Sequence, residues 1–245
     1  MITVSLDYLD RRIYRKRETE ILLPDKSSLF VSDKFAVELF RKLGSEYEHK
    51  SSYNSYYHSK DKALLILDEG DFELSTQQKG LFFNYPNWKI QHDLITEHII
   101  SNKSSYHYTR ADLAFTTTED WFNLVKKIDF KNLLVKTYSR KNELETILAE
   151  NSRLDVVFYN KTKSLKKVRN KDYLNSFKEK FPQEQLYRLE IRLKGKDTLV
   201  KVPSLMAEKI DLKAIALEIF TALEKRVHLP NKLKNKLKEA IYAIE

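Results

Sequence analysis

The chain has no cysteine among its 245 residues. This absence excludes disulfide bonds, thiol nucleophiles and cysteine-based zinc sites together. No segment approaches the roughly 18 consecutive apolar residues that a membrane span needs. The N-terminus has neither the cationic start nor the apolar run of a signal peptide. We therefore expect a cytoplasmic protein that has no membrane partner.

Glycine and proline are also scarce, with 4 and 5 residues. Nothing resembles a glycine-rich phosphate-binding loop, so the sequence gives no sign of nucleotide-driven chemistry. No internal repeat is visible either, which argues against a solenoid. Hydrophobic residues make up 42% of the chain and charged residues 32%. A chain of this length and composition fits one globular domain, or one domain with an appendage.

The net charge of +9 favours a polyanionic partner. Charge alone does not distinguish DNA from RNA or from an anionic membrane surface. Cations concentrate in the segment 161–171, which we interpret as a phosphate-contacting loop, although many such runs are solvated faces. The cations of this segment are Lys161, Lys163, Lys166, Lys167, Arg169 and Lys171.

Alternating and short apolar runs predict strands, and apolar residues three or four apart predict helices. The expected strands are 2–6, 19–23, 63–68, 80–85, 106–116, 133–138, 154–160 and 186–193. The expected helices before residue 200 are 32–43, 91–101, 119–128, 141–149 and 173–181. Strands and helices do not alternate regularly, which predicts an α+β fold with a mainly antiparallel central sheet and flanking helices.

The C-terminal segment differs from the rest of the chain in its pattern. Residues 211–227 have apolar side chains at helical spacing, and Pro230 interrupts the pattern. A second amphipathic helix follows it. We therefore divide the chain into a main domain, 1–200, and a C-terminal helical tail, 201–245. The apolar stripes of the tail fit either docking on the sheet or contact with a partner.

Three predicted strands each contain one chemically capable side chain: Asp112, Tyr159 and Glu190. Side-chain alternation places both carboxylates on strand faces that also carry arginine. Two carboxylates suit Mg²⁺ or Mn²⁺, which prefer oxygen ligands and also take phosphate oxygens. The competing interpretation is an ordinary set of ion pairs, because structural ion pairs produce the same clusters.

Tyr159 is a candidate nucleophile, because a tyrosine hydroxyl can attack a phosphodiester. Lys161 and Lys163 follow it, and their charge favours the phenolate form that attacks. The competing interpretation is a tyrosine placed for strand packing, since tyrosine is favoured in strands and this chain has 14 of them. A second aromatic feature is the tyrosine-rich segment 46–60, a loop or irregular strand whose rings suit stacking on unpaired bases.

The order of these motifs resembles a known family. Arg-x-Asp-Leu-Ala-Phe (110–115) is followed by hydrophobic-Tyr-Asn-Lys (158–161) and then by aromatic-Arg-hydrophobic-Glu-Ile-x-Leu (187–193). This order is similar to that of the rolling-circle plasmid replication initiators of the Rep_trans family. The filamentous-phage nicking replication proteins show a looser version of it. Phe-Phe-Asn-Tyr-Pro-Asn (82–87) also resembles a segment of the plasmid proteins, so the likeness spans 81–193.

The resemblance implies a role for each matching residue. Tyr159 takes the place of the nucleophile and Lys161 that of the lysine after it. Asp112 and Glu190 take the places of the metal-binding acids, for Mg²⁺ or Mn²⁺. One position departs from the pattern, because the plasmid proteins usually have a second acid where this chain has Thr116. The chain also lacks the His-hydrophobic-His motif by which another class of tyrosine endonuclease binds its metal.

The activity implied is a metal-dependent endonuclease that nicks and rejoins origin DNA through a 5′-phosphotyrosine intermediate, to start rolling-circle replication of a plasmid or phage. The main domain would be the DNA-nicking domain, and the tail would serve a homodimer or a host helicase. Two alternatives stay open: a non-catalytic origin-binding protein of the same fold, and a nicking enzyme for mobilisation or transposition. The expected DNA contacts are Arg110, Lys163, Lys166, Lys167, Arg169, Lys171, Arg188 and Arg192.

Overall fold

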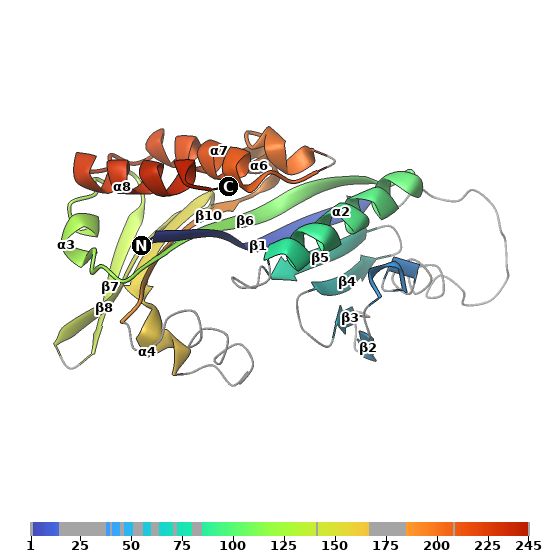
Figure 1. Cartoon of the computed structure of the whole chain (residues 1–245), viewed down its shortest axis with the longest axis horizontal. Coiled ribbons are helices and arrows are strands. Elements are labelled where there is room, and N and C mark those ends of the chain that lie inside the picture. Colours follow the sequence, from blue (N-terminus) through green and yellow to red (C-terminus); the bar gives the residue numbers. More distant parts are fainter. Residues whose placement is uncertain are drawn as a thin grey trace, which may run out of the picture.

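Ten strands form one sheet in the computed structural model of this chain, and every neighbouring pair is antiparallel. The strand order is β2-β3-β4-β5-β1-β6-β10-β9-β8-β7 (Figure 1). With its helices, the sheet confirms the predicted α+β class. The structure describes residues 2–14, 38–39, 41–44, 47–50, 56–59, 64–70, 73–79, 85–140, 142–166, 185–207 and 209–244.

The strand bounds follow the chain in sequence order. They are β1 Ile2–Tyr14, β2 Tyr47–Lys50, β3 Tyr56–Ser59, β4 Leu64–Gly70, β5 Glu73–Lys79, β6 Ser105–Thr117, β7 Leu134–Arg140, β8 Glu143–Glu150, β9 Leu154–Asn160 and β10 Tyr187–Lys194. The helices are α2 Tyr85–Ser101, α3 Phe122–Val125, α4 Lys161–Leu165, α6 Lys196–Leu199, α7 Leu212–Glu224 and α8 Asn231–Tyr242, and a 3-10 turn, η1, spans Pro203–Met206. None of the described helices is long and apolar enough to cross a membrane.

Two faces of the sheet have opposite character between β6 and β9. Leu113, Phe158 and Ile191 point to one face and are fully buried in the main hydrophobic core. Helices α7 and α8 cover that face (Figure 1) and contribute Ile219 and Leu237 to the same core. The alternate residues of these strands, which include the predicted site residues, point to the other face.

Both predicted tail helices, α7 and α8, are present. Their apolar faces pack against the hydrophobic face of the sheet. The side chain of Asp211 caps α7 by accepting a hydrogen bond from the amide of Ala214 at 3.1 Å. Helix α8 begins directly after Pro230. The apolar stripes of both helices pack on the sheet, which is one of the two roles that the sequence left open. The division of the chain at residue 200 stays a prediction.

A second, smaller core lies toward the other end of the sheet. It joins Ile13 of β1, Ile66 of β4 and two residues of α2, Ile95 and Ile99. Helix α2 is tied to the central strands by polar contacts as well. Arg11 donates a hydrogen bond to Thr96 at 3.1 Å, and His92 Nε2 lies 2.7 Å from the hydroxyl of Tyr108. These contacts fix the α2 end of the two longest strands, β1 and β6.

Two helix predictions are wrong. Residues 141–149 were expected to be helical, but 143–150 form β8, which pairs with β7 and β9. Asn142 turns the β7–β8 hairpin with a φ of 62°, and Ile147 packs opposite Phe158, so tertiary pairing overrides the local spacing. The helix expected over 119–128 is only α3, 122–125. After Val125 the chain continues through hydrogen-bonded turns to Asp129, which pairs with His228 in an isolated β-bridge.

Other predicted elements are shifted or lie outside the described residues. Helix α2 begins at Tyr85, so that residue is not the end of a strand and the helix starts earlier than the predicted 91. The segment 46–60 contains a short hairpin, β2 and β3. Of the helix expected over 32–43, residues 38–39 and 41–43 are helical. The strand 19–23, residues 80–84 and the helix 173–181 lie outside the described residues.

Candidate active site

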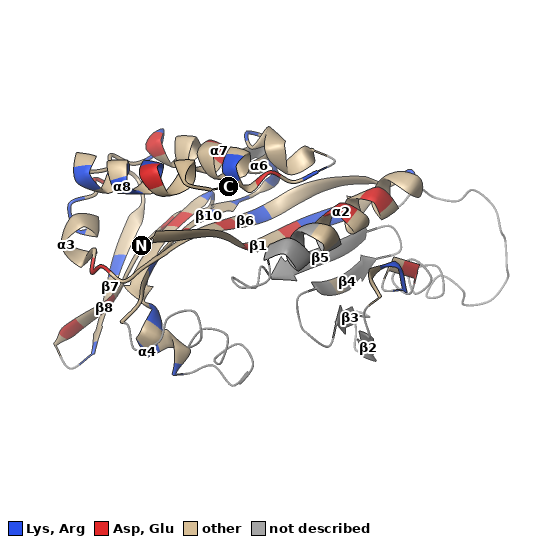
Figure 2. Ribbon diagram, viewed as in Figure 1, with Lys and Arg blue, Asp and Glu red and all other residues tan. Residues whose placement is uncertain are grey.

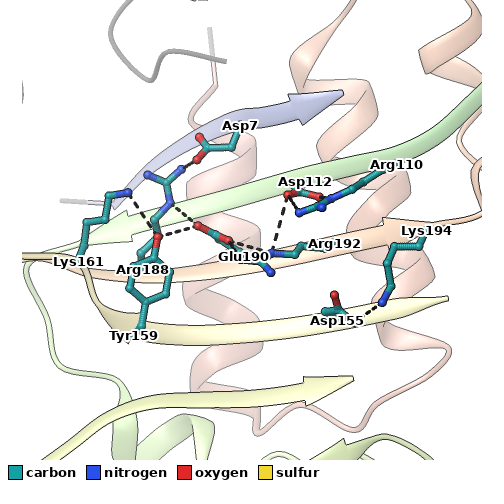
Figure 3. A network of polar contacts seen from close by, with 10 residues as sticks. All are labelled: Asp7, Arg110, Asp112, Asp155, Tyr159, Lys161, Arg188, Glu190, Arg192 and Lys194. Carbon is teal, nitrogen blue, oxygen red and sulfur yellow. Dashed lines mark hydrogen bonds and ion pairs between the residues drawn. The ribbon is translucent and has the colours of Figure 1, made fainter. Parts of the chain in front are cut away.

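The sheet brings the three predicted site residues onto one face (Figure 3). The cross-strand partners are Asp112 with Arg192, and Tyr159 with Arg188. Glu190 lies two residues from each of those arginines on β10, so it shares their face. Directly opposite residues on neighbouring strands lie close enough for side chains to touch. The acid of β6, the acid of β10 and the tyrosine of β9 therefore form one cluster on the face away from α7 and α8.

Tyr159 contacts both a carboxylate and an amine. Its hydroxyl donates a hydrogen bond to Glu190 Oε1 at 2.7 Å. Lys161 Nζ lies 3.4 Å from the same hydroxyl oxygen and 5.7 Å from the centre of the ring. Lys161 is buried at the first position of α4, where its amide donates to the carbonyl of Leu186 at 2.7 Å. Burial lowers the pKa of this lysine, and the nearby Glu190 only partly offsets that effect.

Glu190 is held as a carboxylate by two arginines. Burial alone would raise its pKa, but the attraction of Arg188 and Arg192 outweighs it and holds the pKa below the usual glutamate range. Arg188 Nε lies 3.3 Å from Glu190 Oε1, and Arg192 donates two hydrogen bonds to Oε2 at 2.6 and 3.0 Å. Glu190 Oε1, which accepts the hydrogen bond from Tyr159, is therefore also the carboxylate oxygen that contacts Arg188.

Arg188 has no solvent exposure and forms a second ion pair, with Asp7 of β1. The register of β1 and β6 shifts between Leu6 and Tyr8, and such a bulge re-aims the extra residue. Here that residue is Asp7, which Ser5 also contacts at 2.9 Å. Burial lowers the pKa of Arg188 to about 10, so the guanidinium stays charged at neutral pH.

Asp112 accepts a two-pronged pair of hydrogen bonds from Arg110, at 2.8 and 2.6 Å. Burial raises the pKa of Asp112, and these bonds only partly offset it. The guanidinium of Arg110 lies 4.7 Å from the centre of the Tyr8 ring, a cation–π contact. Arg192 lies between the two acids, with its Nε 3.8 Å from Asp112 Oδ2 (Figure 3). Basic and acidic positions thus alternate along β6 and β10 (Figure 2).

The two carboxylates fit a divalent cation by their oxygen chemistry. A cation already bridges them, since the guanidinium of Arg192 contacts Glu190 Oε2 and faces Asp112 Oδ2. Asp112 and Glu190 are therefore close enough to share one cationic partner in the structure. Within the described residues no group of three or more histidine and acidic side chains is placed to hold a metal. Asp112 and Glu190 are therefore the candidate ligands, with solvent or phosphate completing the shell.

The remaining predicted residues divide into three groups. Lys163 Nζ pairs with Glu143 and Glu145 at 2.7 and 3.1 Å, so it braces α4 against β8 in the structure. Lys166 ends α4 and is exposed. Lys167, Arg169 and Lys171 lie outside the described residues.

Two further positions bear on the predicted metal site. His107 stacks on Tyr14 with ring centres 5.3 Å apart. Strict alternation would place His107 on the face opposite Asp112, but the register shift pairs it with Arg12, so it shares the face of the acids and lies five residues along the strand from Asp112. Thr116, where the plasmid proteins usually have an acid, is fully buried. Its hydroxyl oxygen has no hydrogen-bond partner among the described residues. This position therefore supplies a neutral side chain, and Asp112 is the acid that remains of the expected pair on β6.

Sequence reasoning missed Asp7, the counter-ion of Arg188. Asp7 directly follows the predicted first strand, 2–6, where an aspartate is an ordinary solvent-facing residue. Only the bulge turns Asp7 toward the site. The local sequence has no glycine or turn residue that would predict this bulge. Sequence reasoning also missed the pair of Lys194 with Asp155 at 2.7 Å, which extends the row of charges along the same face.

Comparison with known proteins supplies a structural likeness. No protein-family model matches the sequence, and no curated protein matches it. Among solved structures, the rolling-circle replication initiator protein from Geobacillus stearothermophilus aligns with a TM-score of 0.62 and 14% sequence identity. The alignment covers 99% of this chain and 97% of that one. The chain has the fold of a rolling-circle replication initiator. At this identity the likeness concerns the fold, and it confirms the resemblance that the motifs indicated.

The burial of Arg188 leads to a prediction about stability. Replacing Arg188 with alanine leaves Asp7 and Glu190 without their common counter-ion, and breaking a buried ion pair costs about 3–5 kcal/mol. We expect the free energy of unfolding in urea to fall by that amount. The matched control is Lys194→Ala, which removes a half-exposed pair worth about 1 kcal/mol or less. Equal effects of the two substitutions would contradict a structural role for the buried guanidinium.

Proposed function

We propose that this protein nicks and rejoins origin DNA through a covalent link between Tyr159 and a 5′-phosphate, and so starts rolling-circle replication of a plasmid or phage. The observation that supports the proposal most is the contact of the Tyr159 hydroxyl with Glu190 at 2.7 Å, beside Lys161 and on the fold of a replication initiator. A tyrosine placed only for packing does not need a carboxylate and an amine at its hydroxyl.

In this proposal Glu190, which accepts a hydrogen bond from the Tyr159 hydroxyl, takes up the proton of the attacking group. As the phenolic oxygen forms its bond to phosphorus, the bond from phosphorus to the 3′ oxygen breaks. Glu190 accepts the phenol proton, because it is the ionised carboxylate to which the hydroxyl is hydrogen-bonded. The 3′ oxygen takes up a proton from solvent and becomes the 3′-OH that primes synthesis. The reverse reaction closes the strand without a nucleotide cofactor, because the phosphotyrosine link conserves the phosphodiester bond energy.

Lys161 and the arginines supply positive charge around the reacting atoms. Lys161 stabilises negative charge on the tyrosine oxygen, which it approaches to 3.4 Å. Arg110 and Arg192 keep 37% and 29% of their side chains exposed, so they are available to phosphate oxygens while pairing with the acids. The proposed phosphate contacts also include the cations of the segment 161–171, of which Lys161, Lys163 and Lys166 are among the described residues.

The proposed cofactor is Mg²⁺ or Mn²⁺, held by Asp112 and Glu190. When bound, such an ion polarises the scissile phosphate and offsets charge that develops on it. Burial raises the pKa of Asp112, and a divalent cation beside it would favour its ionised form. In the structure Glu190 Oε1 contacts the tyrosine hydroxyl and Oε2 contacts Arg192.

The tyrosine mechanism predicts a covalent adduct that depends on one hydroxyl. Supercoiled DNA with the replicon's own origin is incubated with the protein and Mg²⁺ or Mn²⁺, and the products are denatured in SDS. We expect nicked DNA and a protein–DNA adduct, both lost in Tyr159→Phe. Tyr242→Phe, a change at an exposed tyrosine of α8, should leave both unchanged. Origin binding without nick or adduct would instead support a non-catalytic origin-binding protein.

The position of Arg192 predicts competition between an arginine and the metal ion. Replacing Arg192 with glutamine removes a positive charge that contacts Glu190 and lies 3.8 Å from Asp112 Oδ2, the two proposed metal ligands. Two unit charges about 4 Å apart interact by on the order of 1 kcal/mol even in a water-like dielectric. We expect the affinity for Mn²⁺, measured by the loss of the free-ion electron paramagnetic resonance signal, to rise about tenfold or less. Lys194→Gln is the control, as it removes a charge from the same strand. Unchanged or weaker Mn²⁺ binding in Arg192→Gln would contradict the assignment of the site.

A further inference from the structure

Strand β7 forms the outer edge of the sheet, and every one of its residues is exposed. It pairs only with β8, and the hairpin projects beside α4 (Figure 1). Within the described part of the chain, no other strand lies on its free side. An exposed edge strand of this length needs either a partner or a device against unwanted pairing.

The register places Tyr138 of this strand on the face that holds the candidate active site. Tyr138 pairs with Thr146 of β8, and Thr146 pairs with Tyr159 of β9. Opposite residues on neighbouring strands point to the same face and have Cβ atoms about 5 Å apart. Tyr138 therefore lies in the same cross-strand row as the proposed nucleophile, two strands and roughly 10 Å away.

The side chains around Tyr138 have the composition of a single-strand binding surface. Tyr138 is 52% exposed, although tyrosine gains from burial. Lys136 and Arg140 lie two residues before and after it on β7, so the three side chains share a face. Lys136 also pairs with Glu150 at 2.5 Å, in the open, where such a pair exchanges readily for a phosphate.

Unpaired bases stack on exposed aromatic rings, while neighbouring cations contact the phosphates. We propose that the exposed face of β7, with Tyr138 between Lys136 and Arg140, is a stacking platform for the unpaired DNA strand that approaches Tyr159. This inference rests on the proposed function, since it names the strand's path to that site. The net charge of +9 and the position in line with Tyr159 favour DNA over a second copy of this chain at the edge.

The test is equilibrium binding of a fluorescently labelled single-stranded oligonucleotide from the origin, measured by anisotropy. The Tyr159→Phe background and EDTA prevent cleavage. Base–aromatic stacking predicts that Tyr138→Ala weakens binding by roughly 5- to 100-fold. Tyr138→Phe, which keeps the ring, should bind like the parent. Tyr242→Ala, at a 61% exposed tyrosine on α8, should have no effect. The affinity for a duplex of the same sequence should change little, because its bases are already stacked.

Three results would overturn the platform. They are an unchanged single-strand affinity in Tyr138→Ala, an equal loss for duplex DNA, and a loss in Tyr138→Phe as large as that in Tyr138→Ala. A change in oligomeric state without a change in affinity would assign the edge to self-association, which also overturns it. Because Tyr138 is exposed, these variants are expected to fold, which thermal unfolding verifies.

The same variants separate this inference from the proposed function. If the protein with Tyr159 intact nicks the origin but Tyr138→Ala binds single-stranded DNA with unchanged affinity, the platform is contradicted and the nicking function is supported. If Tyr138→Ala selectively loses single-strand affinity but the parent protein gives no nick or adduct, the platform is supported and the nicking function is contradicted. No binding of single-stranded DNA by the parent sinks both.

Discussion

The buried guanidinium of Arg188 is the interaction on which the rest of the site depends. A charge without solvent exposure is tolerated only when counter-charges replace the lost water, and here Asp7 and Glu190 provide them from two other strands. The pairing fixes Glu190 in place and keeps it ionised. Glu190 is then positioned to accept the hydroxyl proton of Tyr159, which lies directly opposite Arg188 in the register of β9 and β10. The β-bulge at Asp7 turns this side chain toward Arg188, so that the two can pair.

Charge balance explains why such a cluster suits a phosphate. Four cationic side chains surround the site against three carboxylates, which leaves an excess of one positive charge for an incoming phosphodiester. A preorganised field of this kind lowers the cost of developing negative charge, because the groups need not reorient during the reaction. The same balance accounts for the arginine between the two acids, which screens their mutual repulsion. The cations are Arg110, Arg188, Arg192 and Lys161, and the acids are Asp7, Asp112 and Glu190.

The sequence predicted most of the site because strand alternation is a short-range rule. It placed Asp112 and Glu190 on faces that also carry arginine, and the register then brought them together with Tyr159. It also predicted both C-terminal helices from their apolar spacing. It failed where long-range pairing decides the outcome. Residues 143–150 have spacing compatible with a helix, and only the neighbours β7 and β9 make them a strand. The role of Asp7 depends on a bulge that has no local signature, so no single-sequence rule would have found it.

The central claim is that one hydroxyl, that of Tyr159, becomes linked to DNA. The most direct test is to isolate the SDS-stable adduct, trim the DNA with nuclease, digest the protein with trypsin and locate the remaining nucleotide by mass spectrometry. Cleavage after Arg153 and Lys161 releases residues 154–161, in which Tyr159 is the one hydroxyl-bearing side chain. The account predicts a nucleotide attached to this peptide. A nucleotide attached to any other peptide would show that the site described here does not hold the nucleophile.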